Sequence, residues 1–291
     1  MERQLWPELS RAINDVARTR QANAFHSHDH ATIVRVYLWS VLHDRPVSWA
    51  CQTCNWHPNI RVKDLPHQCT MSRRMRTKPI KDFLHALGKR MNNQKPWHLL
   101  KIIDGKSLTV AAHSKDPDAA WGRGAGQKAK GYKLHAIIDG SGFPPVWEVH
   151  PLNHDEKTAA RSMLPRMTGQ GYLVGDKMFD ASHLHDAAAA NGHRLIAPRK
   201  NRFGGLGHRH HSPHRLACIE SLEAPKSIHG DSFARFLMRC RKRIETSFGN
   251  LVGFGGGLTH LPPWVRRLHR VEPYVHAKLI INAARIRLKY A

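Results

Sequence analysis

The sequence predicts an α/β protein, in which a mixed sheet flanked by helices follows a helical N-terminal domain. Three observations lead to this prediction. Apolar residues recur at helical spacing within residues 1–98. From residue 99 onward, short apolar runs end at turn residues, as strands do. These runs alternate with helical segments, an order typical of a sheet covered by helices. We therefore expect two domains, residues 1–98 and residues 99–291.

Four segments of the first domain carry helical patterns. In the first, Ile33, Val36 and Val41 recur at roughly helical spacing. Pro46 stands near the first turn of the second, where proline is tolerated. We expect Thr70 or Ser72 to cap the third, since a hydroxyl can accept a free backbone N–H there. The segments are residues 31–44, 45–56, 65–77 and 79–92.

Two of these short helices suit a helix-turn-helix that binds DNA. The second helix of the pair bears Arg73, Arg74 and Arg76, which are candidate DNA contacts. The same pattern also fits an ordinary helical bundle that presents a solvated basic face.

The second domain alternates strand and helix signals. A strand is expected around Asp104, and two more are joined by a turn at Asp139-Gly140. Asp155 is expected to cap a helix, and Asp180 to begin another. Strand signals lie in residues 98–108, 131–153, 171–180 and 193–198. Helices are expected over 155–167, 181–192 and 234–251 and at the C-terminus, and a long polar loop over 199–232.

The charge balance points to a polyanionic partner. The chain has 46 Lys and Arg against 22 Asp and Glu, which gives a net charge of +24. Nucleic acid is the usual partner of so basic a protein, and an anionic membrane surface is the second possibility. However, no apolar run approaches the roughly 20 residues of a spanning helix. The charged N-terminus also lacks the apolar core of a signal peptide. We therefore expect a soluble, intracellular protein.

Two aspartates follow apolar runs in the second domain. Asp104 comes after “KII” and Asp176 after “YLVG”. If the two strands are neighbours, both carboxylates meet at one edge of the sheet, where a cation must offset their repulsion. Oxygen ligands suit Mg²⁺ or Mn²⁺ rather than Zn²⁺. The alternative for Asp104 is a plain turn residue, because Gly105 follows it.

Glu245 is the third candidate acid. It lies at the margin of a predicted buried helical stripe, from which it could reach a metal. Arg241 lies one turn earlier on the same face, so an ordinary surface ion pair is the alternative. The predicted stripe consists of Phe233, Leu237, Cys240, Ile244 and Leu251.

Five segments in order resemble bacterial insertion-sequence transposases with a DDE domain of ribonuclease H-like fold. They are “IIDGKSL”, “KGYKLHAIIDGSGFP”, “HPLNHDEKTA”, “YLVGDKMFDAS” and “RKRIETSFGNL”, and the resemblance covers residues 99–288. The family carries Asp, Asp and Glu at places that correspond to Asp104, Asp176 and Glu245. One subgroup has a Tyr and a Lys where this chain has Met238 and Val252, so membership of that subgroup stays open.

The resemblance implies a DNA transposase. The three acids would bind Mg²⁺ or Mn²⁺, as two ions, and act on DNA phosphodiesters by cleaving element ends and joining a 3′-OH to target DNA. Its partners would be double-stranded DNA and, because two ends must be paired, a second copy of the chain. Its place would be the bacterial cytoplasm, with the nucleoid. Two alternatives remain: a catalytically silent DNA-binding descendant, and a metal-dependent nuclease without strand transfer.

Further basic residues are candidate DNA contacts. Phosphate recognition needs only a well-placed positive charge. The candidates in the second domain are Lys177, Arg241, Arg266, Arg267 and Arg270.

The cysteines allow two readings. An odd total of five argues against a disulfide framework. Several of them lie near histidines and could form a zinc site, or Cys51 and Cys54 could instead face a helical core. The zinc candidates are Cys51, Cys54, His57, His67 and Cys69.

Overall fold

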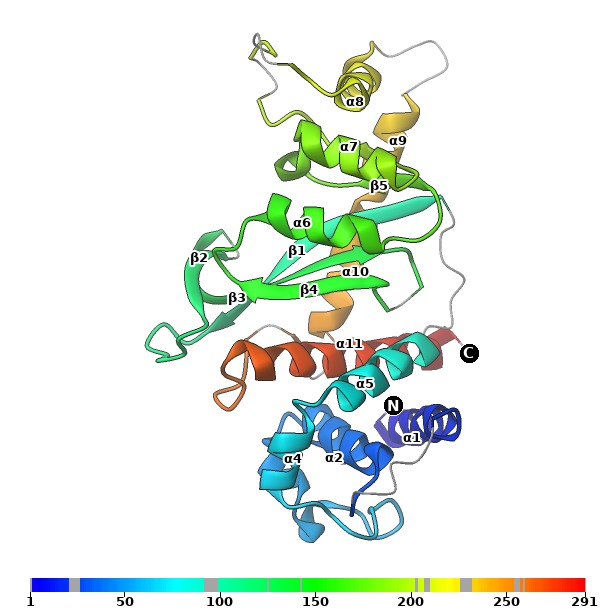
Figure 1. Cartoon of the computed structure of the whole chain (residues 1–291), viewed down its shortest axis with the longest axis vertical. Coiled ribbons are helices and arrows are strands. Elements are labelled where there is room, and N and C mark those ends of the chain that lie inside the picture. Colours follow the sequence, from blue (N-terminus) through cyan, green and yellow to red (C-terminus); the bar gives the residue numbers. More distant parts are fainter. Residues whose placement is uncertain are drawn as a thin grey trace. The chain divides into compact units, whose positions relative to one another are not determined.

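The chain folds into two units whose boundaries differ from the predicted ones. The computed structural model describes residues 2–20, 27–91, 99–124, 126–141, 143–201, 204–206, 210–225, 232–253, 257–258 and 260–290 (Figure 1). One unit consists of residues 1–94, 114–118 and 250–291, and the other of residues 95–113 and 119–249. The C-terminal helix therefore belongs with the N-terminal helices, and not with the sheet as the sequence led us to expect.

The first unit is helical. Asp29 caps its second helix by accepting the backbone N–H of Thr32 at 2.7 Å. His67, rather than Thr70 or Ser72, caps the fourth, and both hydroxyl residues lie inside that helix. The helices are α1 (Glu2–Arg18), α2 (His30–Leu42), α3 (Val47–Ala50), α4 (Gln68–Arg74), α5 (Lys78–Met91) and α11 (Leu268–Tyr290), with a 3₁₀ turn at Thr53–Asn55.

The C-terminal helix joins this unit because its apolar side chains pack there. Val271, Val275 and Ile280 of α11 are fully buried, and α11 contacts α5, α1 and α2. The segment 114–118 belongs to the same unit, since Asp116 and Asp118 accept the backbone N–H groups of Arg267 and Leu268 at 3.1 and 2.9 Å. A helix in water gains most of its stability from burying an apolar face against other elements, and α11 buries its face here.

A buried histidine in α11 makes this unit sensitive to acid. His276 is 4% exposed, and burial lowers its pKa to about 3, helped by the neighbouring His85. In the unfolded chain a histidine binds a proton near pH 6.5, well above the pKa of His276 in the folded protein. The neutral His276 therefore costs the folded state nothing above pH 6.5, and the folded state loses stability as the pH falls from 6.5 toward the folded pKa.

We therefore expect the free energy of unfolding to drop below pH 6.5 by up to about 1.4 kcal/mol per pH unit for this histidine. Urea unfolding measured from pH 7 to pH 4 should show a shallower slope in H276L. The exposed His57 supplies the control, because H57L should keep the wild-type slope. Equal slopes in H276L and wild type would contradict this assignment.

The second unit is a mixed sheet with helices on both faces. Its strands are β1 (Leu100–Val110), β2 (Ala120–Gly124), β3 (Gln127–Ile138), β4 (Val146–Pro151), β5 (Gly171–Val174) and β6 (His193–Ile196). Its helices are α6 (Glu156–Met163), α7 (Ser182–Ala190), α8 (Pro213–Glu223), α9 (Phe233–Cys240) and α10 (Lys242–Gly253), with 3₁₀ turns at Leu164–Arg166 and Lys177–Phe179; α10 ends among the residues of the first unit.

The order of the strands explains how the sheet positions distant residues. The order is β2-β3-β1-β5-β6, with β4 also paired to β3. β1 runs antiparallel to β3 and parallel to β5, and β5 runs parallel to β6. The hairpin of β3 and β4 has its turn around Asp139-Gly140, as predicted, and Gly140 adopts the positive φ of 80° that the turn needs.

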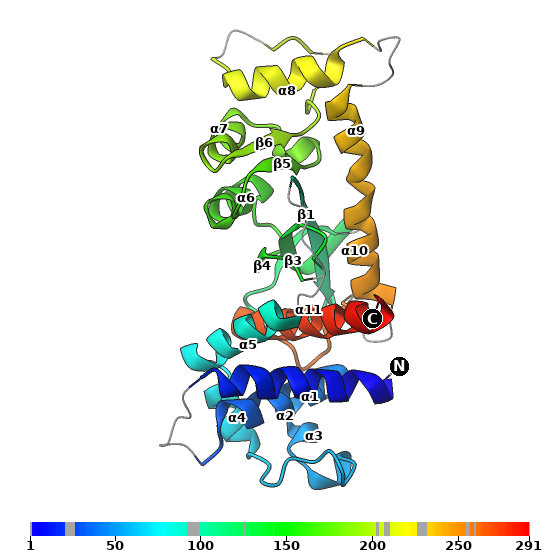
Figure 2. The same cartoon turned by 90° about the vertical axis from the view of Figure 1, so that its right-hand side faces the viewer.

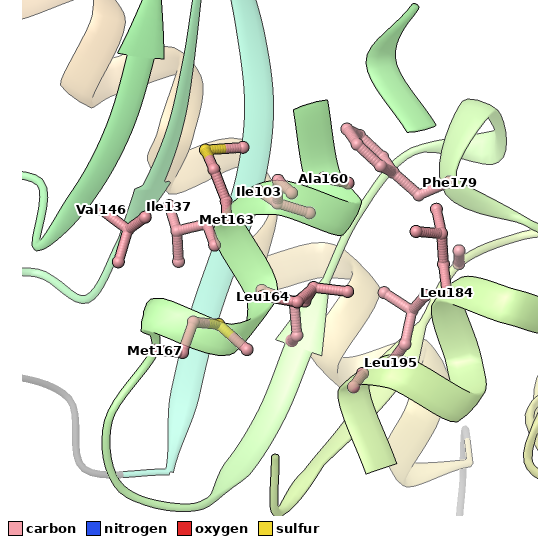
Figure 3. Packing of buried hydrophobic residues seen from close by; sticks show 13 residues of the cluster. Ile103, Ile137, Val146, Ala160, Met163, Leu164, Met167, Phe179, Leu184 and Leu195 are labelled. Carbon is pink, nitrogen blue, oxygen red and sulfur yellow. The ribbon is translucent and has the colours of Figure 1, made fainter. Parts of the chain in front are cut away.

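Each face of the sheet buries its own apolar cluster. On one face, Ile103 and Ile137 pack against α6 and α7, as Figure 3 shows for the side chains around Met163. On the other face, Ile102 and Val174 pack against Leu237 of α9 and Ile244 of α10. Figure 2 shows α9 and α10 along one side of the sheet and α6 on the opposite side. The alternation of Ile102 and Ile103 between faces follows from the two-residue period of a strand.

Three local predictions for this unit need correction. The polar segment 199–232 contains α8, whose Cys218 and Ile219 are buried against the unit. Asp180 does not begin the next helix, since Ala181 is at its N-cap and Asp180 is itself buried. Strand β2 was not anticipated, because it has only five residues and two of them are glycines.

In the described part of the chain, no helix has the length and apolarity to cross a membrane.

Candidate active site

Parallel strands bring Asp104 and Asp176 together. β1 pairs with β5 so that Ile102 lies opposite Val174. Asp104 and Asp176 each follow this pair by two residues, Asp104 within β1 and Asp176 just past the end of β5, so the pairing brings them to the same edge. The expectation that the two acid-bearing strands are neighbours is confirmed. Asp104 does not end its strand, however, because β1 continues to Val110 through its pairing with β3.

Asp104 is held in a partly buried, negatively charged setting. One carboxylate oxygen, Oδ1, accepts the backbone N–H of Gly105 at 2.8 Å. Burial, helped by the charges of Asp176 and Glu156, raises the pKa of Asp104 to about 6, although the Gly105 N–H and Arg241 oppose the shift. A carboxyl group whose charge is disfavoured in this way gains from a cation nearby.

Asp176 lies in the tight turn that follows β5. Its Oδ1 accepts the backbone N–H of Met178 at 2.8 Å and so caps the 3₁₀ turn at Lys177–Phe179. Burial raises its pKa, and the charge of Glu156 adds to this effect, while the Met178 N–H opposes it. Each aspartate thus has one oxygen fixed by a backbone N–H, which limits how the carboxylate can rotate.

Gly175 allows this turn to close. A Cβ at Gly175 would lie 2.8 Å from the ring of Phe179, which is buried in the cluster against α6 and α7. A methyl group there must displace the ring or the turn that carries Asp176, because buried aromatic rings have little room to move.

If the chain cleaves DNA, as the resemblance implies, G175A should lower the cleavage rate by about 10- to 100-fold, since small displacements of catalytic groups have effects of this size. Gel-based cleavage assays on purified protein measure it. G249A is the matched control, because a Cβ at Gly249 meets nothing within 4 Å. Wild-type activity in G175A would show that the turn does not set the position of Asp176.

Glu245 approaches the aspartates only through Arg241. Its side chain is 65% exposed, and its Oε1 lies 3.7 Å from Nη2 of Arg241. The same guanidinium places Nη1 3.5 Å from Oδ2 of Asp104. Among the described residues, no three His, Cys, Asp or Glu side chains are placed so that they hold a metal ion together. Two of the three predicted acids, Asp104 and Glu245, are thus linked by a guanidinium in the structure.

The stripe predicted beside Glu245 is only partly buried. Leu237 and Ile244 are 4% and 0% exposed, whereas Phe233 is 57% exposed and Cys240 is half-buried. Phe233 makes an edge contact with Tyr172 at a centroid distance of 5.2 Å. The side chain of Leu251 lies outside what the structure describes.

Sequence reasoning missed two charged residues next to the aspartates. Lys133 of β3 and Glu156 of α6 form an ion pair at 2.7 Å, with side chains 15% and 21% exposed. A Cβ at Gly105 would lie 3.6 Å from Oε1 of Glu156, so this carboxylate reaches β1 beside Asp104. Its sequence signal is weak, because Glu156 directly follows the helix-capping Asp155 and resembles an ordinary first-turn acid.

The predicted DNA contacts differ in their accessibility. Arg73, Arg76 and Lys177 are exposed. Arg74 is instead 8% exposed, and its Nη1 donates to the backbone oxygen of His28 at 3.0 Å. A guanidinium buried in this way reaches no phosphate unless α4 rearranges.

The three C-terminal arginines also differ in whether their side chains are accessible. Arg267 and Arg270 are exposed. Nη1 of Arg266 donates to the backbone oxygens of Pro262 and Val265 at 2.7 and 2.8 Å, so this side chain is engaged within its own turn.

The zinc candidates are not gathered into a site. Cys54 and Cys69 are exposed and Cys51 is half-buried, where burial raises the pKa of its thiol to about 11. All five candidate side chains lie in the described part of the chain, in which no cluster of three such residues could hold a metal. The alternative that Cys51 and Cys54 both face the core does not hold for Cys54 either.

The mixed sheet with neighbouring aspartates defines an α/β protein with an acidic centre, and sequence comparison identifies its family. Residues 98–266, more than half of the chain, match the family described as “Transposase DDE domain”. The chain belongs to this family.

The chain is also similar to one curated protein and to one solved structure. A putative transposase for insertion sequence element IS6501 of Brucella ovis is 34% identical over 59 residues, which are 20% of this chain and 45% of that protein. The chain therefore spans less than half the length of this relative. A cryo-EM structure of piggyBac transposase in a synaptic complex with hairpin DNA is similar over 96% of this chain and 71% of that chain, with a TM-score of 0.47 and 9% identity.

The residues around Asp104 suit the divalent metal that this family generally uses. The donors are carboxylate oxygens, the ligands that Mg²⁺ and Mn²⁺ prefer. Burial is the main reason why the pKa values of Asp104 and Asp176 are raised, and the charges of neighbouring carboxylates add to it. Asp104 and Asp176 would be two of the ligands of such an ion, and the exposed side chain of Glu245 would have to turn toward them to be a third.

Proposed function

We propose that the protein is a DNA transposase that cleaves the ends of its element and joins the 3′-OH to target DNA. Asp104, Asp176 and Glu245 are its catalytic carboxylates. The observation that supports this most is the parallel pairing of β1 with β5, which brings both aspartates together in a chain of the DDE transposase domain family. The DDE domain on this mixed sheet is the ribonuclease H-like core that such chemistry uses.

The three carboxylates would hold Mg²⁺ or Mn²⁺, as two ions. When bound, these ions would polarise the scissile phosphate and support the attacking and leaving oxygens. The protein itself orients the ligands: backbone N–H groups hold Asp104 and Asp176, and α10 carries Glu245. No side-chain nucleophile is required, because water and then the 3′-OH attack the phosphodiester.

Double-stranded DNA is the proposed partner. The net charge of +24 provides attraction to phosphate, and α3 and α4 are the proposed helix-turn-helix. Arg73 and Arg76 are exposed on or just after α4. We expect R73Q/R76Q to weaken duplex binding and to flatten its salt dependence, as measured by fluorescence anisotropy; unchanged binding would remove these two residues from the interface.

The proposed protein acts as a homodimer on DNA in the bacterial cytoplasm, with the nucleoid. Two element ends must be held together for joining, which requires a second copy of the chain. Sedimentation of the full-length protein with and without end-bearing duplex tests this: a complex with a single copy of the chain on paired ends would contradict it.

An assay with Mg²⁺ and DNA that carries the element ends separates the possible functions. A transposase cuts the ends and produces joined products, and both activities are lost in D104A and E245A. E220A is the matched control, because Glu220 is an exposed glutamate on α8. Cutting without joined products would indicate a nuclease. Binding of the ends without any cutting would indicate a silent DNA-binding protein, and cutting by D104A at the wild-type rate would refute the site.

A further inference from the structure

Arg241 occupies the junction between two helices of the sheet unit. α9 ends at Cys240 and α10 begins at Lys242. The backbone N–H of Arg241 donates to Met238 at 3.1 Å, and its carbonyl oxygen accepts the N–H of Ile244 at 3.0 Å. Both bonds span three residues, which tightens the helix at this point as a 3₁₀ turn does. Tightened turns inside helices change the direction in which a side chain leaves the axis.

The guanidinium at this junction faces two carboxylates from different parts of the chain. Nη1 lies 3.5 Å from Oδ2 of Asp104, and Nη2 lies 3.7 Å from Oε1 of Glu245. A surface pair between Arg241 and Glu245 alone would be ordinary for residues one turn apart. The contact with Asp104 is different, because it joins α10 to the central strand β1 across 137 residues of sequence.

These contacts are suited to being exchanged. Both distances exceed the 2.7–2.9 Å of a strong charge-assisted hydrogen bond. The side chains are also partly exposed, at 30% for Arg241 and 24% for Asp104, so water and salt screen the pair. A guanidinium held this loosely can leave when a stronger cation reaches the same oxygens.

We infer that Arg241 is a positioning residue that keeps Asp104 and Glu245 together before a metal binds, and that competes with the metal for them. The inference rests on the proposed function, because it assigns the same two carboxylates as metal ligands. A DNA phosphate offers the guanidinium a bidentate partner instead. Binding of DNA therefore draws Arg241 away and frees the carboxylates, which couples metal loading to the presence of substrate.

Binding of Mn²⁺ to the full-length protein without DNA tests the competition. A merely structural arginine would support the site, so its loss would weaken Mn²⁺ binding. A competing arginine predicts the opposite: R241Q binds Mn²⁺ about two- to fivefold more tightly than wild type, the range expected for losing a partly screened ion pair. Isothermal titration calorimetry at low ionic strength measures the dissociation constants.

K242Q is the matched control. Lys242 is exposed, adjacent to Arg241 and of the same charge, so both variants change the net charge equally. Equal Mn²⁺ affinity in R241Q and K242Q, or weaker binding in R241Q than in wild type, would overturn the inference. If R241Q fails to fold, R241K takes its place as the test variant. A single ammonium group bridges two carboxylates poorly, so R241K is also expected to bind Mn²⁺ more tightly than wild type.

D104N separates failure of this inference from failure of the proposed function. If D104N binds Mn²⁺ as tightly as wild type, the ion is not held at Asp104 and the proposed site is wrong, together with the role of Arg241. If D104N loses tight binding while R241Q matches K242Q, the site stands and Arg241 does not compete. With a short duplex present, the affinity ratio of R241Q to wild type should fall toward one, and an unchanged ratio would contradict release by phosphate.

Discussion

Replacing Asp104 with asparagine is expected to reduce DNA cleavage by at least about 1,000-fold, as is usual for a member of a catalytic group that acts as a unit. Asparagine keeps the shape and can still accept the N–H of Gly105, so the fold should persist. What is lost is a negative charge toward the metal. For the same reason D104N/D176N should be no worse than either single variant, because the two carboxylates serve one function.

Single-turnover cleavage of end-bearing DNA measures this effect, with circular dichroism as the check on folding. D186N is the control, since Asp186 is an exposed aspartate of α7 and asparagine can still accept its hydrogen bond from Ser212. Two results would count against the site. One is a loss of only a few-fold in D104N, and the other is independent, multiplying losses from D104N and D176N.

Replacing Asp180 with asparagine is expected to lower the free energy of unfolding by about 3–5 kcal/mol, the usual cost of breaking a buried ion pair. Asp180 is 6% exposed and accepts two hydrogen bonds from Arg215, at 2.6 and 2.8 Å. The backbone N–H of Lys200 adds a third at 3.1 Å. This pair fixes α8 to the turn after β5, and its loss leaves the Arg215 charge without its carboxylate partner.

The effect should depend on pH. Burial alone would raise the pKa of Asp180, but the hydrogen bonds and charge of Arg215 outweigh it, so the pKa lies below its usual value. The stabilisation is therefore present above the unfolded pKa of about 3.9 and is lost as the pH falls through the folded value. Urea unfolding should show the difference between D180N and wild type at pH 7 and a smaller one below pH 4.

Two further variants check the cause. D180L/R215M should be less destabilised than D180N, because it removes both charges rather than leaving one buried. D82N breaks the exposed pair of Lys78 and Asp82 and should leave stability nearly unchanged. A double variant that is as unstable as D180N would mean that packing, and not the unpaired charge, explains the loss.

The sequence predicted the strands that carry the aspartates better than the surroundings of these residues. Apolar runs before Asp104 and Asp176 reveal strands, and parallel pairing of two such strands is a common outcome in α/β folds. Whether β1 continues beyond Asp104 depends on β3, which offers partners as far as Val110. Local sequence contains no information on that partner, so Asp104 was expected at a strand end.

Burial of polar residues was the harder problem. Arg74 was expected on a DNA-facing surface, but it is buried where His28 supplies an acceptor. Asp180 was expected at a helix start, but its partner Arg215 lies 35 residues away. Phe233 was assigned to a buried stripe and is exposed. In each case a distant segment decides, and a periodic pattern records only which residues share a face.

The path of the chain has a consequence for how such a protein can change over generations. The chain passes between the two units at residues 94/95, 113/114, 118/119 and 249/250, so the helical unit is assembled from three separate stretches. An exchange of the first 98 codons between related elements would separate α5 from the α11 against which it packs.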